Sequence, residues 1–446
     1  MIKVSNISVW MLCEIFNVKK TEVDLKFSLI SLDSREKSNE NFCFFAIKGT
    51  NYDGNDFVSQ AIENGAKIVI SDKEIDNNTA ICIRVDDTKK ALGILAKHLK
   101  GITPTIGITG SVGKTTTKEM IKIILSEKFV VNATEGNNNN EIGVPITILK
   151  NLSADYHVIE MGMRNFGEID WLSFICSPEI SIITNAGTSH IGILKDESSI
   201  FKCKSEIINN TKRAVILPNE QRFKALDVKG LKTVFVGDNN NISLHKARYF
   251  DNGIEFDVKW KNSVIKGIKM HTFSEHNLKN AMFAISAAKM LNFNDDEIRS
   301  GLSKFKSSNM REEYKSINGI TVICDCYNAS FESMKSAIIS LKKYSVLKNK
   351  TPYALLGDML ELGEYSREFH YRIGELAKDI GIKNIFAQGK YAPEIIDGFA
   401  GGVICQDKKE IAKIITKSLG NNDVILVKAS RKLNFENIIK EMEIIC

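Results

Sequence analysis

The sequence contains no apolar run that approaches the ~18 residues needed to cross a membrane. An apolar patch at residues 9–13 is interrupted by Glu14, and no small-residue cleavage site follows it. No block of Lys or Arg is interleaved with aromatic residues, and 60 basic against 54 acidic residues leave a net charge of only +6. These absences argue against a membrane span and against nucleic-acid binding, and we expect a cytoplasmic protein.

The nine cysteines are scattered without the C-x-x-C spacing of many metal and redox sites. Several lie in apolar, strand-like runs, so we expect reduced thiols in the core. Hydrophobic residues make up 43% of the chain and charged residues 26%, which are ordinary globular values, so we expect no long disordered region. At ~150 residues per domain, a chain of 446 residues is expected to form about three domains.

Short apolar strands alternate with helices along the chain, which predicts an α/β fold. Gly101 and Pro104 interrupt a helix and mark the end of a small α/β domain at residues 1–101. Residues 102–309 supply strands that each stop at a polar residue, which predicts a central parallel-sheet domain. Residues 310–446 again alternate strand and helix, which predicts a doubly wound, Rossmann-like domain.

The segment 105–120 combines an apolar strand, a glycine turn and a helix. Glycines let backbone N–H groups face a phosphate, and the helix N-terminus adds partial positive charge. Lys114 can reach the terminal phosphates, and Thr115 can ligate Mg²⁺. The spacing is unusual, because five residues rather than four separate Gly107 from Gly113. The segment nevertheless predicts a phosphate loop, and therefore an ATP-using protein.

Further polar residues stand where a nucleotide site is expected. Glu160 ends an apolar strand, and ligands gather at the carboxyl ends of parallel strands, so it is a candidate for Mg²⁺. Asn185 ends the next strand, and His190 follows it in a loop. Lys202 and Lys204 are expected early in a helix. Each of these residues alone is more often structural than functional.

Taken in chain order, the residues resemble the Mur ligases of peptidoglycan synthesis, with motifs in all three expected domains. The matching segments are Gly110-Ser-x-Gly-Lys-Thr-Thr116, Glu160-Met-Gly, Asn185-x4-His190, Lys204-x-Glu-Ile207, His276-Asn-x-x-Asn280-Ala, Arg311 and Asp325-x-Tyr-Asn-Ala329. Leu356-Gly-Asp-Met-Leu-Glu-Leu-Gly-Glu364, followed by His370, is similar to the family member that adds D-alanyl-D-alanine to a UDP-N-acetylmuramoyl-tripeptide. Asp33-Ser-Arg35 and the stretch from Ala46 to Gly54 are similar to its UDP-binding domain.

The resemblance implies a set of site residues. The catalytic residues would be Lys114, Lys204 and His190. ATP would contact Gly110, Ser111, Gly113, Lys114, Thr115, Thr116, Asn277, Asn280, Arg311 and Asp325. Mg²⁺ would be held by Thr115, Glu160, His190 and Lys204, the last as a carbamate formed with CO₂. The UDP-tripeptide would contact Ser34, Arg35, Lys48, Gly49, Asn138 and Asn139.

The implied reaction makes an acyl phosphate from ATP and joins it to D-alanyl-D-alanine, in a protein expected to be a monomer. A sister Mur ligase or a folylpolyglutamate synthetase shares the core motifs, although the segment 356–364 argues against both. A GTPase would carry an Asn-Lys-x-Asp motif, which the sequence lacks. A fourth hypothesis is a protein that descends from this family and binds its ligands without catalysis.

Several positions depart from the family pattern without removing a proposed metal or phosphate group. Ser330-Phe331 stand in place of Asn-Pro, Met310 and Ala429 in place of glycines, Asn55 in place of histidine and Lys202 in place of alanine. These departures bear on the contacts to the acceptor, and therefore on specificity more than on the class of reaction.

Overall fold

The computed structural model describes residues 1–188, 191–228, 230–238, 240–307 and 310–445. Tertiary contacts divide the chain into two compact units. The first comprises Met1–Ile108, Lys128–Ser181 and Glu206–Arg213, and the second comprises Thr109–Glu127, Ile182–Ser205 and Ala214–Cys446. Each unit is therefore built from segments that are distant in the sequence.

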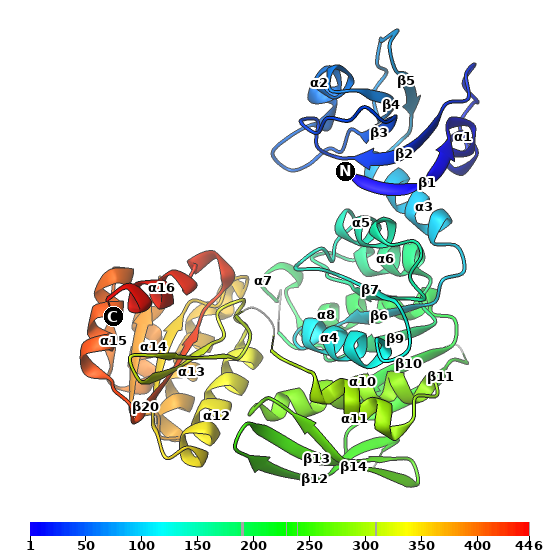
Figure 1. Ribbon diagram of the computed structural model, residues 1–446. Helices are drawn as coiled ribbons and strands as arrows, with labels where there is room; N and C mark the ends of the chain where they lie inside the picture. Colours follow the sequence, from blue (N-terminus) through cyan, green and yellow to red (C-terminus); the bar gives the residue numbers. More distant parts are fainter. Residues whose placement is uncertain (189–190, 229, 239, 308–309, 446) are drawn as a thin grey trace. The chain divides into compact units, whose positions relative to one another are not determined.

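The N-terminal part of the first unit is a five-stranded sheet in the order β1-β2-β3-β4-β5 (Figure 1). β1 and β2 are antiparallel, and the remaining pairs are parallel. Phe42 and Phe44 of β3 pack with Val58 and Ala61 of α2 in one apolar cluster. The elements are β1 (Ile2–Ser8), α1 (Val9–Phe16), β2 (Lys26–Ser31), β3 (Phe42–Phe45), α2 (Val58–Glu63), β4 (Ala66–Ser71), β5 (Ile81–Arg84) and α3 (Thr88–Lys100).

A second sheet has nine strands in the order β14-β13-β12-β11-β10-β9-β6-β8-β7. β6, β8 and β7 are parallel, with Ile108 opposite Glu160. β12, β13 and β14 form an antiparallel meander. The strands are β6 (Thr105–Thr109), β7 (Val131–Ala133), β8 (Tyr156–Glu160), β9 (Ile180–Ile183), β10 (Ala214–Pro218), β11 (Lys232–Val236), β12 (Ile242–Phe250), β13 (Gly253–Trp260) and β14 (Ser263–Met270).

Helices of this region connect the strands and pack among themselves. In the second unit, α4 packs on both α10 and α11. Gly301 of α11 lies so close to α4 that a Cβ would be 2.7 Å from Cα of Ile124. The helices are α4 (Lys114–Leu125), α5 (Gly143–Lys150), α6 (Glu168–Cys176), α7 (Ile191–Leu194), α8 (Glu197–Ser205), α9 (Gln221–Lys224), α10 (Glu275–Met290) and α11 (Asp295–Ser303).

The C-terminal part of the second unit is a six-stranded sheet in the order β15-β16-β20-β17-β18-β19. Only β15 is antiparallel to its neighbour among the described pairs. Helices α15 and α16 pack on one face, and α12 contacts β17 and β20. The elements are β15 (Glu313–Ile317), β16 (Ile320–Cys324), α12 (Phe331–Leu347), β17 (Thr351–Gly357), α13 (Ser366–Asp379), β18 (Asn384–Gln388), α14 (Ala392–Phe399), β19 (Val403–Ile404), α15 (Lys408–Ser418), β20 (Asp423–Lys428) and α16 (Glu436–Ile445).

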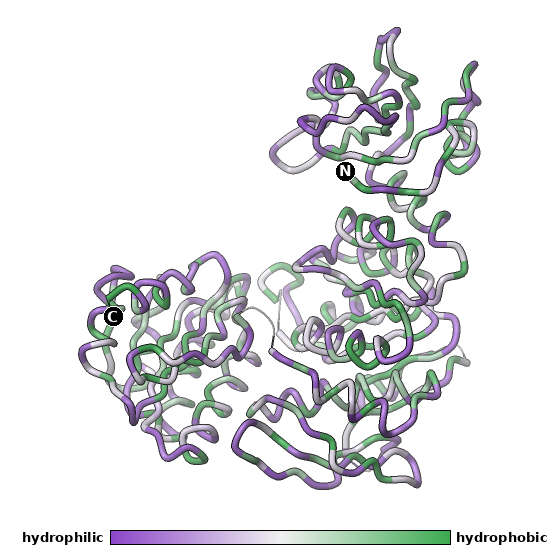
Figure 2. Tube along the Cα trace, in the orientation of Figure 1, coloured by the Kyte–Doolittle hydropathy of each residue, from purple (hydrophilic) through white to green (hydrophobic). Residues whose placement is uncertain are grey.

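These three sheets confirm the predicted α/β fold with a small N-terminal sheet, a central sheet that carries the phosphate loop and a doubly wound C-terminal sheet. Apolar stretches follow the strands, and hydrophilic stretches follow many of the connecting loops (Figure 2). The eight cysteines within the described ranges carry free thiols, as expected, and seven of them are buried. Among the described residues, no helix is long and apolar enough to cross a membrane.

One expectation about local structure was wrong. Lys202 and Lys204 were expected early in a helix, but α8 begins at Glu197 and ends at Ser205, so they lie in its last turns. The helix starts earlier because Asp196 caps it, with Oδ1 accepting from the backbone N–H of Ser199 at 2.8 Å. The consequence is that Lys204 lies close to the C-terminal end of the helix.

A buried histidine in β8 makes the first unit sensitive to acid. His157 is fully buried, and its Nδ1 lies 3.0 Å from the amide nitrogen of Asn132. Burial, with a smaller contribution from the charge of Lys100, lowers the pKa of His157 to about 4. The unfolded chain, with an ordinary histidine pKa, therefore binds more protons than the folded chain between pH ~4 and ~6.5.

The contribution of His157 to the free energy of unfolding is accordingly fully present above pH ~6.5, and it is lost as the pH falls toward 4. At about 1.4 kcal/mol per pKa unit, His157 accounts for about 2 kcal/mol between pH 7.5 and pH 5. His157→Asn keeps an acceptor for Asn132 but cannot be protonated, so its unfolding free energy should fall by about 2 kcal/mol less over this range. Urea unfolding at both pH values measures the difference, and equal losses in the two proteins would contradict it.

Candidate active site

The loop between β6 and α4 requires glycine at two positions. Gly110 has φ +150° and Gly113 has φ +84°, where residues with a Cβ are rarely found. A Cβ on Gly110 would lie 2.0 Å from Oγ1 of Thr184, and one on Gly113 would lie 2.4 Å from Oδ1 of Asn280. Lys114 begins α4 directly after Gly113, so the loop leads into a helix N-terminus, which attracts anions.

The side chain of Asn185 holds this loop in shape. Its Oδ1 accepts hydrogen bonds from the backbone N–H groups of Ser111 and Val112, both at 3.0 Å, and its Nδ2 donates to the carbonyl of Val112 at 2.8 Å. Nζ of Lys114 donates to the carbonyl of Gly110 at 2.6 Å. The structure thus brings the predicted loop residues together with Asn185, which braces the loop.

Thr115 and Thr116 follow in the first turn of α4, where both are half-buried. Of the remaining predicted nucleotide contacts, α10 brings Asn277 and Asn280 to the loop. Asn280 lies against Gly113 and donates through Nδ2 to Oδ1 of Asn277 at 3.2 Å. The position of the loop therefore depends on α10 as well as on its own glycines.

Glu312 is a functional candidate that the sequence analysis missed. Its Oε2 accepts from Nδ2 of Asn277 and from Oγ1 of Thr272, each at 2.8 Å, and its Oε1 accepts from the hydroxyl of Tyr314 at 2.9 Å. Burial raises the pKa of Glu312 to about 7, although these hydrogen bonds oppose the rise. Because Arg311 precedes it and another glutamate follows it, the segment resembles an exposed charged run, and only the fold reveals its contacts.

Lys204 lies buried, with 2% of its surface exposed. Burial lowers its pKa well below the ordinary value, the charge of Lys114 lowers it further, and the carboxylate of Glu332 opposes this. The low pKa favours the neutral amine over an ammonium, which would be costly to bury. A neutral amine is also the form that can react with CO₂.

Glu160 is held in the first unit by two neighbours. It is 3% exposed at the end of β8, and its Oε1 accepts from Nδ2 of Asn139 at 2.9 Å. Its backbone N–H donates to Oγ1 of Thr134 at 2.9 Å. Asn138 precedes Asn139 in the same loop, and a Cβ on Gly143 would lie 2.5 Å from Cα of Asn138. Asn139 therefore orients Glu160, in addition to any contact with substrate.

The described residues contain no group of three or more His, Cys, Asp or Glu side chains able to hold a metal. His190, one of the predicted ligands, lies outside the described residues. The other candidates are Thr115, Glu160 and a carbamate on Lys204, which all offer oxygen. Mg²⁺ prefers oxygen ligands and is commonly bound through one or two carboxylates together with substrate phosphates. The oriented, buried carboxylate of Glu160 fits such an ion.

The half-buried Asp325 and the buried Lys428 form an ion pair at the carboxyl ends of β16 and β20. Nζ of Lys428 lies 2.7 Å from Oδ2 of Asp325 and also donates to the carbonyl of Asn328 at 3.1 Å. The sequence analysis predicted Asp325 but missed Lys428, although its place at the end of an apolar strand was a usable signal. Arg311 stacks over the ring of Tyr327 at 4.0 Å from the ring centroid.

The predicted UDP contacts lie in two loops at one edge of the N-terminal sheet. Ser34 and Arg35 follow β2, and Lys48 and Gly49 follow the neighbouring parallel strand β3. Arg35 forms a two-point ion pair with Asp33, which lowers the pKa of that carboxyl group to about 2. The guanidinium is therefore held by its neighbour while most of its side chain stays exposed.

The surroundings of four departures from the family pattern are visible in the structure. Ser330 caps α12, with Oγ accepting from the N–H of Ser333, so it serves a capping role for which asparagine is equally suited. Asn55 donates to Asp53 and to Asp72 at 2.7 Å. Ala429 is buried opposite Gly357, where a second Cβ would lie only 2.8 Å away. Met310 has φ +58°, a conformation that glycine adopts more readily.

Comparison with known protein families agrees with this arrangement. The Mur ligase family catalytic domain matches residues 26–100, the Mur ligase middle domain matches 108–288, and the Mur ligase glutamate ligase domain matches 310–431. The chain belongs to the Mur ligase family.

Individual relatives cover nearly the whole chain. It is 36% identical to the UDP-N-acetylmuramoyl-tripeptide--D-alanyl-D-alanine ligase of Bacillus subtilis, over 93% of this chain and 92% of that one. A crystal structure of MurF from Acinetobacter baumannii superposes with a TM-score of 0.90 at 26% identity, covering 99% and 100%. MurF ligase from Thermotoga maritima in complex with ADP superposes at 0.84 and 27% identity, covering 93% and 97%.

The loop geometry predicts a strong effect of one methyl group. Gly113→Ala should weaken ATP binding at least tenfold, because the new Cβ would meet Oδ1 of Asn280 and displace the loop. Gly167→Ala is a matched control, since Gly167 also caps a helix at φ +83° but has open space around it. Titration with a fluorescent ATP analogue measures both, and equal effects in the two variants would contradict the steric argument.

Proposed function

We propose that the protein is an ATP-dependent ligase that joins D-alanyl-D-alanine to UDP-N-acetylmuramoyl-tripeptide, giving the UDP-pentapeptide of peptidoglycan synthesis. The observation that carries the proposal is the proximity of the glycine loop to the buried Lys204 within one unit. Lys114 belongs to that loop, and its charge acts on Lys204. The name of the 36% identical relative supports the choice of substrates.

The chemistry requires activation, because a carboxylate oxygen is a poor leaving group. The peptide carboxylate attacks the γ-phosphorus of ATP, the bond to ADP breaks, and an acyl phosphate forms. The amine of the dipeptide then attacks the acyl carbon, phosphate leaves, and the nitrogen gives up a proton. Lys114 and the loop amides neutralise charge on the transferred phosphoryl group and align it.

In this proposal Thr115, Glu160, His190 and Lys204 hold Mg²⁺, with Lys204 carbamylated. Bound Mg²⁺ supplies positive charge at the phosphoryl group. The neutral amine of Lys204 attacks CO₂ and releases one proton, which leaves an anionic oxygen ligand. The nucleotide contacts are the loop residues with Asn277, Asn280, Arg311 and Asp325. The UDP-tripeptide contacts are Ser34, Arg35, Lys48, Gly49, Asn138 and Asn139.

The division into domains at 1–101, 102–309 and 310–446 also belongs to the proposal, supported by the spans of the three family models. We expect a cytoplasmic protein, since the substrates are soluble nucleotide and peptide compounds, and we also expect a monomer.

The test of the function is phosphate release from ATP that requires both UDP-N-acetylmuramoyl-tripeptide and D-alanyl-D-alanine. Parallel assays with L-lysine and meso-diaminopimelate tripeptides identify the preferred donor. Lys114→Ala should lower kcat by about 10²–10³-fold or more, as loss of a key charge-stabilising donor does. Near-normal turnover of this variant, or release without the dipeptide, would argue against the proposal.

Lys204→Ala should lower kcat by about 10²–10³-fold, because the variant lacks the site of the carbamate. Added acetate or formate should restore part of the activity by supplying a carboxylate in the vacated space. Lys204→Met is a control of similar length that leaves no room for the anion and should not be rescued. Full activity of Lys204→Ala without added carboxylate would rule out the carbamate.

A further inference from the structure

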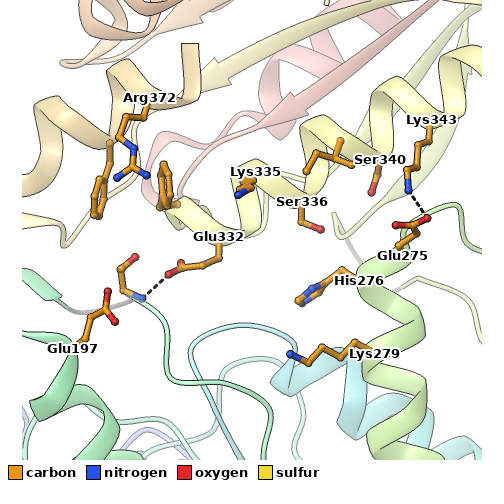
Figure 3. A pocket seen from close by; sticks show the side chains of 14 residues that line it. Glu197, Glu275, His276, Lys279, Glu332, Lys335, Ser336, Ser340, Lys343 and Arg372 are labelled. Carbon is orange, nitrogen blue, oxygen red and sulfur yellow. Dashed lines mark hydrogen bonds and ion pairs between the residues drawn. The ribbon is translucent and has the colours of Figure 1, made fainter. Parts of the chain in front are cut away.

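A cavity of about 600 Å³ opens within the second unit, a size usual for small-molecule sites. Thr188, Glu197 and α10 line one side, and α12 and α13 line the other (Figure 3). None of the proposed ATP, metal or UDP contacts that the structure describes lines it, and the dipeptide, the remaining substrate of the proposed reaction, has no assigned site. The cavity is therefore a candidate site for the dipeptide.

Glu332, in the first turn of α12, presents an unsatisfied acceptor in this cavity. Its Oε1 accepts from the backbone N–H of Thr188 at 2.6 Å. Its Oε2 is buried and has no hydrogen-bond partner among the described residues. A buried carboxylate oxygen without a donor is costly, so a ligand that brings an N–H group would be favoured here.

The location of Glu332 suits the reacting end of a ligand. Its charge acts on Lys204, which in turn senses the charge of Lys114. The carboxylate of Glu332 is therefore close enough to Lys204 to act on its charge, and Lys204 is one of the lysines that we assign to phosphoryl transfer.

The basic residues of the cavity differ in what already holds them. Arg372 pairs with Glu368 at 3.3 Å and stacks over the ring of Phe331 at 4.8 Å. Lys343 pairs with Glu275. Lys335 and Lys279, by contrast, form no ion pair with any described residue. Arg372 and Lys343 are therefore engaged in ion pairs, and Lys335 and Lys279 are available to an anion.

Lys335 lies three residues after Glu332, and residues at this spacing share one face of a helix. Figure 3 shows both side chains leaving α12 on the side of the cavity. Their Cβ atoms are expected about 5–6 Å apart. A dipeptide in extended form spans about 7 Å between its charged ends. The acid and the base are therefore spaced for the two ends of one zwitterionic dipeptide.

We propose that this cavity binds the dipeptide acceptor, with its amine on Oε2 of Glu332 and its carboxylate on Nζ of Lys335. The apolar side chains of Phe331 and Ile339 offer contacts for the two methyl groups. Phe331 is one of the departures from the family pattern, so part of the cavity lining differs in this chain from that pattern. The assignment rests on the proposed function.

The first variant tests the amine contact. Glu332→Gln keeps an oxygen for Thr188 but replaces the second acceptor with an NH₂ group. KM for D-alanyl-D-alanine should rise about ten- to a hundredfold, the usual effect of losing a hydrogen bond to a charged group. Formation of the acyl phosphate from ATP and UDP-tripeptide alone, trapped as a hydroxamate with hydroxylamine, measures separately what the loss of the Glu332 charge does to Lys204, and it should change by a smaller factor than KM for the dipeptide. Glu375→Gln, an exposed change on α13, is the control and should alter neither quantity.

The second variant tests the carboxylate contact, and it remains informative if Glu332→Gln does not fold. Wild-type protein should prefer D-alanyl-D-alanine over D-alanyl-D-alaninamide by about ten- to a hundredfold in kcat/KM. Lys335→Gln should reduce this preference toward one, whereas Glu332→Gln should retain it. An unchanged KM in Glu332→Gln, or an unchanged preference in Lys335→Gln, would overturn the assignment. A wild-type protein that neither forms the hydroxamate nor uses the dipeptide would instead refute the proposed function.

Discussion

The carboxamide of Asn185 is the contact on which the nucleotide loop depends. One oxygen accepts two successive backbone N–H groups, and the nitrogen of the same group returns a hydrogen bond to the loop. Such a side chain satisfies polar backbone that would otherwise be buried without partners. The close approach that this requires leaves no space for a Cβ at Gly110. The conformation of the loop therefore depends on Asn185, which follows β9, as well as on the glycines of the loop itself.

Around that loop the fold buries several ionisable groups, and their shifts have a common physical origin. Desolvation is the largest cause for Lys204 and for Glu312, and in each case it favours the uncharged form. For Lys204 the result is chemical, because a neutral amine is reactive. For Glu312 the result is structural. Its carboxyl group, whose pKa is raised to about 7, accepts a hydrogen bond that holds Asn277. Burial thus makes the Lys204 amine reactive and raises the pKa of Glu312. The groups around each side chain determine whether it reacts or positions a neighbour.

The sequence predicted most of the fold because parallel strands and helices alternate in it with clear periods. Glu160, Asn185 and Asp325 could be found because strand ends in parallel sheets meet at one edge. Lys428 obeys the same rule, but its strand is distant in sequence from that of Asp325, and their pairing appears only in the register of β16 and β20. Glu312 and Glu332 could not be found, since nothing local distinguishes them from surface glutamates. The start of α8 differs from the prediction because Asp196 caps the helix well before the Lys202–Lys204 motif.

The departures from the family pattern show how specificity can vary while the reaction is kept. The glycine loop and Lys204 lie in parts of the chain where burial and close contacts restrict substitution. Ser330 and Phe331 instead lie at the start of α12, where the first residue needs only a capping side chain and the second faces a cavity. Phe331 supports Arg372 by stacking, so one change alters both the wall and the placement of a charge. Variation at this helix start therefore acts on the molecule bound in the cavity, while the phosphate loop and the buried lysine stay as they are.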